Sequence, residues 1–572
     1  MLTGNKYILL LCFLFSLNLY AQQEILRNSR YEVTYDGSTR FISVEELASG
    51  KREQFTPTFV VLFKSTATTP KVISITEEVE NIGYHTVGWD GEPNLFDAKA
   101  GNIRKRSVAS CVKESANRLR FAYTNSGEFT IESTLTLPEG DAEPILEGSI
   151  TAQVQGYYSL GYYGAPEYLP SELDELWQPL VWTDKIFPKN KYLTPAHLCT
   201  LPCTMLRKNN VTSGVIADPS EFTFNLMPTM ARSRFGVAIH NNQDKAQSMI
   251  FAPIIGSSYS CKMINETYSF KYRLFVSSKT ISESYADLSQ RLFGFETHSR
   301  NNVLCSLNET FENMMEYCMD PYSKYDEDLK GYSYETDVTG SVRNTSALHA
   351  LNLAFVTDDR TFYSKRAIPV IEFMLSREKD LFALNPTSGA GGQAAYNSLG
   401  NPTIRTSELA MLYKIGNSTN PFMLNMAKEK QQTSTLVTNL AHERTWKENM
   451  SLYKATGEAA YIQLANTGVA TYIQKRLLEK ESEFLYTYHN KSSFWSALAP
   501  KWIELFELYQ TTGKTEYLDA AYEGALRFSR FLWMCPAVPN TSITVNQDNK
   551  APVYGNQTKI PMTVPEETVP AW

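Results

Sequence analysis

Cysteine is scarce in this sequence, which has eight among 572 residues. That frequency is far below the density of a disulfide-stapled scaffold, so we expect stability to come from buried cores. Asp and Glu (61) outnumber Lys and Arg (54), and no basic run stands out, which argues against a nucleic-acid partner. Past residue 21, no apolar stretch reaches the length of a membrane span.

The familiar catalytic signatures are also missing. The chain has no HExxH zinc motif, no P-loop, no dinucleotide fingerprint and no Gly-x-Ser-x-Gly frame. Cys199 and Cys203, with His197 nearby, can be read as metal ligands, but their spacing is loose and no second pair matches it. We therefore favour buried or disulfide-linked cysteines, and we expect neither a metal nor another cofactor.

The first residues have the order of a secretory signal peptide. In "MLTGNKYILLLCFLFSLNLYAQQ", Lys6 precedes an apolar run from Tyr7 to about Leu19, and the small residue Ala21 follows. The run is short for a membrane span, which needs about 20 residues. Cys12 lies inside the run with no small residue before it, so there is no lipobox. We expect cleavage after Ala21 and a periplasmic or secreted protein.

The first half of the chain is predicted to form β-strands. The segment "EFTIESTLTLP" (128–138) alternates, with Phe129, Ile131, Ser133, Leu135 and Leu137 on one face. Similar short runs are "YEVTYDG", "TFVVLFKS", "KVISITEEV", "RFGVAIHN", "SMIFAPII" and "SFKYRLFVS". Turn signals separate these runs, and no helical pattern intervenes. This organisation favours a large antiparallel β-sandwich.

The second half changes its apolar spacing to three and four residues from about residue 281, which is helical. It also repeats itself, because "LYKATGEAAYIQLA" begins at residue 452 and "LYQTTGKTEYLDAA" at residue 508, an offset of 56. Gly457 and Gly513 fall where a helix C-terminus favours a left-handed residue. Trp446 and Trp502 share the same offset of 56. Each copy is therefore predicted to be a helix, a Thr-Gly turn and a second helix.

Two looser copies extend the array: "AFVTDDRTFYSKRA" (354–367), with Asp359 in the place of the glycine, and "LYKIGNSTNPFMLNMA" (412–427). Uneven spacing and long loops favour a closed toroid over an open solenoid. The predicted divisions are a signal peptide (1–21), a β-sandwich domain (22–280), a linker helix (281–300), an (α/α) toroid domain (301–535) and an irregular C-terminal tail (536–572).

A β-sandwich followed by helical hairpins resembles the six-hairpin glycosidases and related polysaccharide lyases, whose N-terminal β-sandwich precedes an (α/α)6 toroid. The resemblance rests on architecture over most of the mature chain. It is closest to proteins of bacterial polysaccharide-degrading systems, including those that act on uronic acids. It implies a multidomain β + α fold and a carbohydrate substrate. Six hairpins need more helices than the roughly nine that the spacing predicts between residues 281 and 534, so we hypothesise a toroid that is incomplete at its C-terminus.

Chemistry is expected in the long loops that precede the first helices of the hairpins: 326–340, 385–403, 441–446 and 486–495. Hydrolysis of a glycosidic bond needs two carboxylates, one as acid and one as base or nucleophile. We select Asp337 and Glu443 as the catalytic pair, with Glu335 as substitute for either. The alternative is structural, because Asp337 is a good helix-start residue and Glu443 can be an ordinary charge on a helix face.

Substrate-binding residues are expected around the same loops. Three arginines fall at nearly equivalent register near helix starts: Arg343, Arg405 and Arg444. In that position they would bind a carboxylate or sulfate group of the substrate. The alternative is that they are solvated surface arginines. The other candidates are aromatic or histidine side chains: Tyr332, Tyr334, His442, Trp446, His489 and Trp495. Tyr334, His442 and His489 also allow a second reaction, since a polysaccharide lyase needs a Tyr or His base beside a uronate.

The segment "GYYSLGYYGAPEYLPSELDELWQPLVW" (156–182) interleaves Gly and Pro with Tyr and Trp. It is predicted to be loop-like, either as a sugar-stacking wall or as packing at a domain interface. The whole sequence predicts a secreted glycoside hydrolase for a polysaccharide or oligosaccharide, with a uronic-acid residue as one option. The alternatives are a polysaccharide lyase for a uronate-containing glycan and a catalytically inactive glycan-binding protein. The sequence does not specify an oligomeric state.

Overall fold

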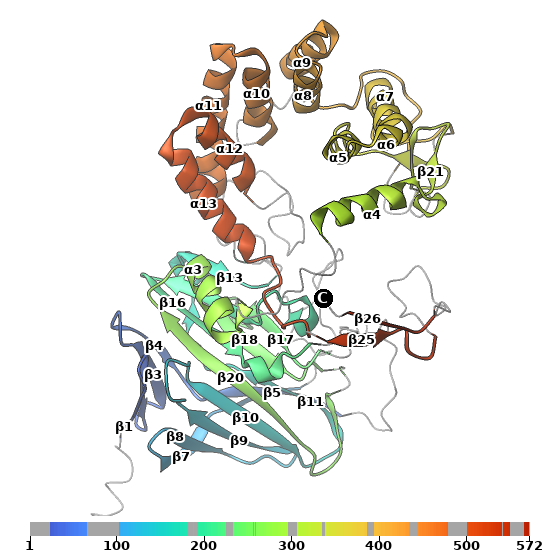
Figure 1. The fold of residues 1–572 in the computed structure, drawn as a ribbon. Coiled ribbons are helices and arrows are strands. Elements are labelled where there is room, and N and C mark those ends of the chain that lie inside the picture. Colours follow the sequence, from blue (N-terminus) through green and yellow to red (C-terminus); the bar gives the residue numbers. More distant parts are fainter. Residues whose placement is uncertain are drawn as a thin grey trace, which may run out of the picture. The chain divides into compact units, whose positions relative to one another are not determined.

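The computed structural model describes residues 23–65, 102–179, 187, 193–224, 233–255, 257, 259–295, 306–334, 338–385, 394–433, 443–478, 500–539, 541–549 and 565–570 (Figure 1). The chain forms two compact units. The first comprises Met1–Ser299, Glu479–Ile503 and Leu518–Trp572, and the second comprises Arg300–Leu478 and Glu504–Tyr517. The protein is therefore a multidomain β + α protein. No helix among the described residues is long and apolar enough to cross a membrane.

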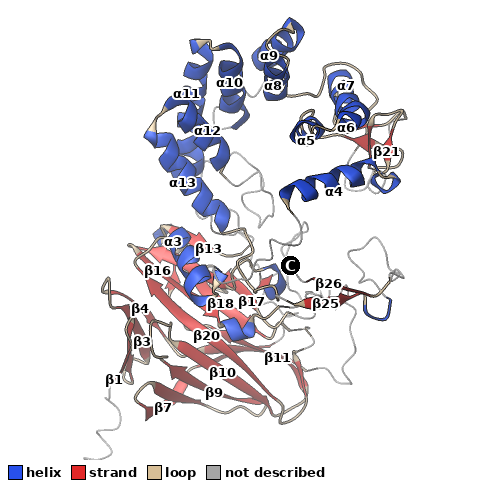
Figure 2. Ribbon diagram, in the orientation of Figure 1, coloured by secondary structure: helices blue, strands red, loops and turns tan. Residues whose placement is uncertain are grey.

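The part of the first unit that precedes α3 is built from one four-stranded and two eight-stranded antiparallel sheets (Figure 2). A meander contains β1 (Gln23–Arg27), β2 (Tyr31–Asp36), β3 (Phe41–Glu46) and β4 (Lys51–Phe55). One eight-stranded sheet has the order β13 (Glu175–Trp177), β15 (Cys203–Lys208), β16 (Val211–Ala217), β20 (Thr267–Ser277), β10 (Ile145–Ala152), β9 (Phe129–Thr136), β8 (Arg118–Tyr123) and β7 (Val108–Ser115). The other has the order β14 (Thr194–Pro195), β17 (Gly236–His240), β18 (Ala246–Ala252), β11 (Gly156–Tyr162), β5 (Phe59–Lys64) and β6 (Asn102–Arg106), with β12 (Glu167–Tyr168) beside β18 and β19 (Cys261–Lys262) beside β11.

The two eight-stranded sheets face each other across an aromatic core. Phe59 of β5 contacts Tyr123 of β8 and Tyr272 of β20 in the opposite sheet, with ring centroids 5.9 and 5.8 Å apart. It also contacts Tyr162 in its own sheet at 5.7 Å. A Cβ on Gly148 of β10 would lie 2.8 Å from the Phe59 ring, so glycine is what lets this large ring sit between the sheets. The predicted antiparallel sandwich is present.

The predicted alternation in β9 is confirmed. The strand buries every second residue, and Phe129, Ile131, Ser133 and Leu135 are all buried. The one polar member of that face, Ser133, has its hydroxyl within 2.7 Å of the Tyr123 hydroxyl, which satisfies both groups in the core. The run "KVISITEEV" lies outside the described residues.

The aromatic segment 156–182 is corrected by the structure. Its first part is β11, in which all seven residues are buried, and not a loop. Tyr158, Tyr162 and Trp177 are 1%, 0% and 1% exposed, respectively. These rings therefore fill the sandwich core and leave no face for a sugar.

Helix α3 (Ile281–Asp287), in the segment predicted to be a linker, packs into the first unit. Thr280 caps it by accepting a hydrogen bond from the backbone N–H of Glu283, whose carboxylate accepts one from the backbone N–H of Thr280 in return. Ile281 and Tyr285 are buried in the sandwich core. The tail predicted to be irregular contains the antiparallel pair β25 (Ser542–Val545) and β26 (Glu567–Pro570).

The second unit contains helices and one small sheet. The helices are α4 (Leu307–Met319), α5 (His349–Thr357), α6 (Arg360–Phe362), α7 (Ile368–Ser376), α8 (Thr406–Ile415), α9 (Pro421–Thr433), α10 (Glu443–Thr456) and α11 (Ala459–Ile473). Two further helices, α12 (Trp502–Thr512) and α13 (Thr515–Ser529), contribute residues to both units. The small sheet has the order β21 (Tyr325–Asp326), β22 (Gly331–Ser333), β23 (Val342–Arg343) and β24 (Leu381–Phe382). The sequence did not predict this sheet.

The 56-residue repeat is confirmed in the turns of two hairpins, α10–α11 and α12–α13. Gly457 and Gly513 have φ angles of +73° and +71°. Their N–H groups donate to the carbonyls of Tyr453 and Tyr509 at 2.8 and 2.7 Å. Glycine is therefore used at both turns because other residues are strained in this left-handed conformation.

The repeat also extends to the packing inside each hairpin. The Trp446 ring contacts the Tyr472 ring at a tilted angle with centroids 5.6 Å apart, and 56 positions later Trp502 contacts Phe528 at 6.2 Å. In each hairpin a glycine lies against the tryptophan, since a Cβ on Gly468 or Gly524 would come within 3.1 or 3.0 Å of the tryptophan Cβ. A small residue on the second helix thus allows the two helices to approach closely.

The third copy of the repeat needs one correction. Asp358, and not Asp359, adopts the left-handed conformation, with φ of 53°. Asp359 instead caps the next helix, because its carboxylate accepts a hydrogen bond from the Phe362 N–H at 2.9 Å. In the fourth copy, Asn417 and Ser418 carry the positive φ angles.

Neighbouring hairpins of the second unit share one core. Leu351 of α5, Phe373 of α7, Leu409 of α8, Ala427 of α9 and Leu452 of α10 belong to a single buried cluster. The next contact along the array is polar: the Tyr517 hydroxyl donates to Asn466 at 2.7 Å. Side-by-side packing of this kind is common to open and closed arrays, so closure into a toroid stays a prediction.

We predict that Gly457→Ala lowers the free energy of unfolding by roughly 1–2 kcal/mol, because a Cβ is strained at positive φ. The measurement is the urea midpoint followed by helical circular dichroism. Gly127→Ala is the control, since a Cβ there meets no atom within 4 Å and the residue is not left-handed. Equal midpoints for Gly457→Ala and Gly127→Ala would contradict the assigned role of the turn.

Candidate functional site

Most residues predicted to act on a substrate fall outside the part of the chain that the structure describes: Glu335, Asp337, His442, His489 and Trp495. Glu443 and Arg444 open α10, but their side chains are also outside the described set. The predicted catalytic pair therefore stays a prediction.

Three predicted binding residues come together on the small sheet. Tyr332 of β22 pairs with Arg343 of β23 in the strand register. The Arg343 guanidinium lies 5.1 Å from the centre of the Tyr334 ring and forms a 3.1 Å ion pair with Asp380. Asp380 already compensates much of the Arg343 charge, which weakens this arginine as an anion ligand. A pocket of about 330 Å³ lies beside these strands and is lined by Lys324, Tyr325, Asp326, Leu329, Ser333, Gly340, Ser341 and Val342.

The Tyr332 phenol is poorly suited to be a general base. Its ring is half-buried and meets Tyr325 edge to face at 5.0 Å. Burial raises the pKa of Tyr332 above its usual value, so the reactive phenolate is disfavoured near neutral pH.

Arg405 and Trp446 lie in different environments. Arg405 is exposed just before α8, where its backbone N–H donates to Glu408 at 3.1 Å, and no ion pair of its side chain occurs among the described residues. The Trp446 side chain is 0% exposed, and its Cβ lies against Gly468 of α11. We therefore assign Trp446 to the core of its hairpin and not to a sugar-binding surface.

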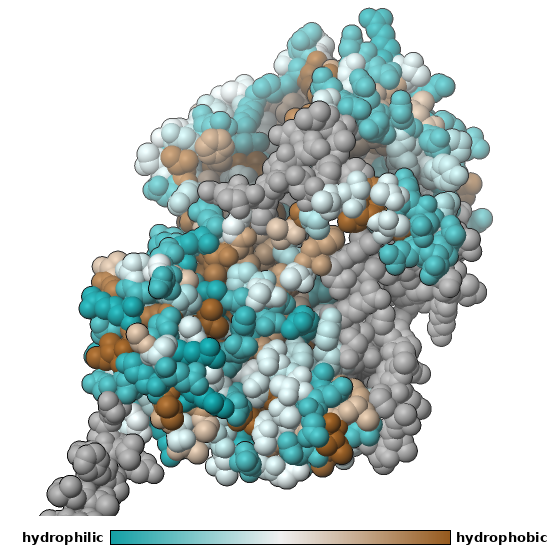
Figure 3. All heavy atoms as spheres, turned by 60° about the horizontal axis from the view of Figure 1, so that its bottom comes forward, coloured by the Kyte–Doolittle hydropathy of each residue, from teal (hydrophilic) through white to brown (hydrophobic). Residues whose placement is uncertain are grey.

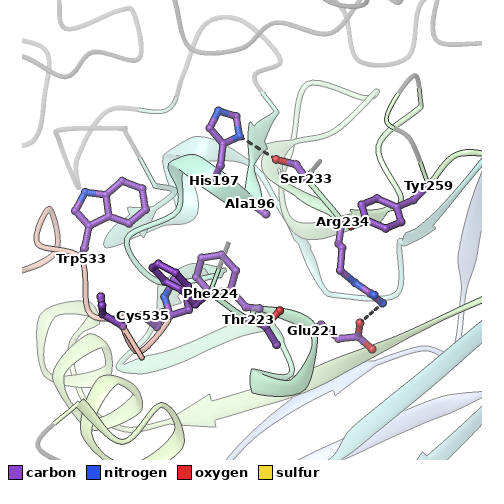
Figure 4. Close-up of a pocket in the computed structure, with 13 residues that line it drawn as sticks. Ala196, His197, Glu221, Thr223, Phe224, Ser233, Arg234, Tyr259, Trp533 and Cys535 are labelled. Atoms are coloured by element: carbon purple, nitrogen blue, oxygen red, sulfur yellow. Dashed lines mark hydrogen bonds and ion pairs between the residues drawn. The ribbon is translucent and has the colours of Figure 1, made fainter. Parts of the chain in front are cut away.

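A second pocket, which sequence reasoning missed, lies within the first unit (Figure 4). It has a volume of about 380 Å³. Its lining comes from distant parts of the chain: Ala196, His197, Glu221, Phe222, Thr223, Phe224, Ser233, Arg234, Tyr259, Trp533, Cys535, Pro536 and Val538. Because these lining residues are spread over more than 300 sequence positions, no local sequence motif identifies the pocket.

An ion pair stands at one side of this pocket. Glu221 ends a short 3-10 helix capped by Asp218, which accepts from the Ser220 N–H at 2.9 Å. The Glu221 carboxylate accepts from Arg234 at 2.6 Å and from the Lys271 backbone N–H at 3.2 Å. Burial raises the pKa of Glu221, and Arg234 opposes that rise. These hydrogen bonds hold the Glu221 carboxylate in place, and the ion pair of Glu221 with Arg234 has no net charge.

His197 stands across the pocket from this pair (Figure 4). Its Nδ1 lies 2.8 Å from the Ser233 hydroxyl, and its Nε2 has no hydrogen-bond partner among the described residues. Burial lowers the pKa of His197 to about 4, so the ring is neutral near pH 7. A neutral imidazole has one donor and one acceptor nitrogen, which suits it to a hydroxyl ligand.

Cys199 and Cys203, which can be read with His197 as metal ligands, have buried side chains. Cys199 and Cys203 are buried thiols in no disulfide, and burial raises the pKa of both. Within the described ranges, no cluster of three or more His, Cys, Asp or Glu side chains could hold a metal ion. The two thiols therefore act as small core side chains.

The sequence matches no family model, and a comparison with curated proteins found no match. Among solved structures, the chain is similar to a polysaccharide lyase, with 11% identity, a TM-score of 0.37, and coverage of 88% of this chain and 82% of the other. It is also similar to an α-mannosidase from Enterococcus faecalis V583 (10% identity, TM-score 0.28, coverage 47% and 31%). An α-galactosidase from Lactobacillus brevis is similar at 10% identity and a TM-score of 0.27, with coverage of 52% and 47%. TM-scores of this size do not establish what this protein does.

We predict that His197 titrates with a midpoint near 4 and not near its usual value of 6.5. Its folded pKa lies below its unfolded pKa, so its contribution to stability is present above pH 6.5 and is lost as pH falls toward 4. The measurement is an NMR titration of the histidine Cε1–H signals, with His197→Gln used to assign the signal. A midpoint of 6 or higher would contradict the buried, neutral state.

Proposed function

We propose that this protein is an exported glycoside hydrolase that cuts a polysaccharide or oligosaccharide, with a uronic-acid residue at the cleaved bond. The observation that carries the proposal is the order of parts in one chain. An antiparallel β-sandwich is followed by helical hairpins that repeat their turn glycine and their Trp–Gly contact. This order supports the resemblance to six-hairpin glycosidases.

The proposed chemistry uses Asp337 and Glu443, with Glu335 as substitute for either. One carboxylic acid protonates the leaving glycosidic oxygen, and the other group, ionised, removes a proton from the attacking water or attacks the sugar carbon itself. Glu335 and Asp337 lie in the segment that joins β22 to β23. Those strands carry Tyr332 and Arg343, so sugar-binding side chains are adjacent in the chain to the proposed acid.

The proposed acidic sugar rests on the arginines. Arg343 is paired with Asp380, whereas Arg405 is exposed and forms no ion pair among the described residues. Arg405 is therefore the stronger candidate to hold a uronate carboxylate, which a guanidinium binds with two parallel hydrogen bonds. Arg444, which falls at nearly the same position of its hairpin as Arg405 does, is proposed as a second ligand of the carboxylate.

A lyase is the second candidate because it would act on the same acidic glycan. It would remove the proton beside the uronate carboxylate, with Tyr334, His442 or His489 as base. Tyr332 keeps its proposed role in substrate binding, because burial raises the pKa of its phenol and so disfavours the phenolate that a base needs.

We predict that Asp337→Asn and Glu443→Gln each lower kcat/KM on a cleaved oligosaccharide by about 100-fold or more, because each removes one proton-transfer group. Both replacements keep the side-chain shape. Glu312→Gln is the matched control, since Glu312 is an exposed carboxylate on α4. Wild-type activity in both Asp337→Asn and Glu443→Gln would refute the catalytic pair, while loss only in Tyr334→Phe or His442→Gln would favour the lyase.

A further inference from the structure

Exposed apolar side chains alone do not single out a binding site on this protein. On the face shown in Figure 3, hydrophobic residues form small groups separated by hydrophilic ones. The 380 Å³ pocket of the first unit differs because it is concave and polar groups converge on it. Its volume lies in the range of small-molecule sites, which is about 300–1,000 Å³.

Aromatic rings supply the apolar part of this pocket. Trp533 is 55% exposed although it lines the cavity, and Figure 4 shows its indole at the pocket. Phe224 and Tyr259 are half-buried in the lining. The Arg234 guanidinium lies 5.7 Å from the centre of the Tyr259 ring, so that ring is held by a cation–π contact. Flat rings of this kind pack against the C–H faces of sugar rings.

Polar groups with spare hydrogen-bonding capacity complete the pocket. His197 Nε2 has no partner among the described residues. The ring nitrogens of a neutral imidazole can donate to or accept from a ligand hydroxyl. The Arg234 side chain, which is 39% exposed, also lines the pocket. These groups reach the pocket from separate elements, as Figure 4 shows.

The charges of the pocket favour a neutral ligand. Glu221 and Arg234 form an ion pair at 2.6 Å and cancel each other. The Glu221 carboxylate would repel a phosphate, sulfate or uronate beside it, and a purely apolar ligand would offer no hydrogen bond to His197 Nε2.

We propose that this pocket of the β-sandwich unit binds a neutral sugar residue of a glycan, with Trp533 as stacking platform and His197, Glu221 and Arg234 as hydroxyl partners. The proposal is independent of the hydrolase site, because its residues take no part in the proposed cleavage. It gives the protein a second carbohydrate site, one that holds a glycan by its neutral residues.

The test is saturation-transfer NMR and calorimetric titration of the full protein with gluco-, manno-, xylo- and galacto-oligosaccharides, and with an oligogalacturonate for comparison. We expect at least one neutral oligosaccharide to bind. Trp533→Ala should weaken that binding at least tenfold, and Trp533→Phe should retain part of it. Tyr322→Ala is the matched control, because Tyr322 is an aromatic residue that is 85% exposed and lies outside the pocket.

Two designs keep this result separate from cleavage. Binding is measured in the Asp337→Asn background, so that failure of the hydrolase proposal leaves the binding readout intact. His197→Gln is measured beside Trp533→Ala, and its circular dichroism spectrum confirms folding. No binding by any neutral oligosaccharide at about 10 mM, far weaker than specific recognition, would overturn the proposal. So would equal binding by wild type and Trp533→Ala, or Trp533-dependent binding of the oligogalacturonate alone.

Discussion

Hydrogen bonds from Thr200 and Tyr285 fasten the residues that follow α13 to the β-sandwich, and the sandwich pocket depends on them. The Thr200 hydroxyl donates to the Arg530 carbonyl at 2.7 Å, and its own carbonyl accepts from the Met534 N–H at 3.1 Å and from the Cys535 thiol at 3.6 Å. The Tyr285 hydroxyl donates to the Leu532 carbonyl at 3.0 Å. Thr200 is buried, and an unpaired buried group costs about 1–3 kcal/mol. The segment 530–535 is thereby fixed on the sandwich, and Trp533 is placed at the pocket lined by residues from the first half of the chain.

The helical hairpins follow a different constraint, the close approach of two helices at a glycine. Gly468 and Gly524 lie against Trp446 and Trp502 at the same offset. The tryptophan on the first helix fits only because the facing residue of the second helix is glycine, which has no side chain. The turn between the two helices also requires a residue in the left-handed conformation. Two local requirements therefore recur in each hairpin, which is why the sequence repeats there so visibly.

Features that depend on neighbouring residues could be predicted from the sequence, whereas contacts between residues far apart in the sequence could not. The alternation of β9 and the positive φ of Gly457 follow from neighbouring residues alone. Strand β11 was mistaken for a loop because it is buried on both faces and so lacks alternation. Its Gly161 is there because a Cβ would meet the Phe251 ring at 2.4 Å, and not to give a loop flexibility. The small sheet has strands of two or three residues, too short to show a period, and the sandwich pocket assembles side chains that no spacing connects.

The two proposals assign different tasks to the two units: we propose that the sandwich pocket holds neutral sugars, and that Asp337 and Glu443 of the hairpin unit cleave the glycan. The most direct test of the central claim is to incubate the wild-type protein with neutral and acidic oligosaccharides and to weigh the products by mass spectrometry. The account predicts fragments whose summed mass exceeds that of the substrate by one water. Fragments with no added water and a new carbon–carbon double bond would contradict hydrolysis and identify an elimination.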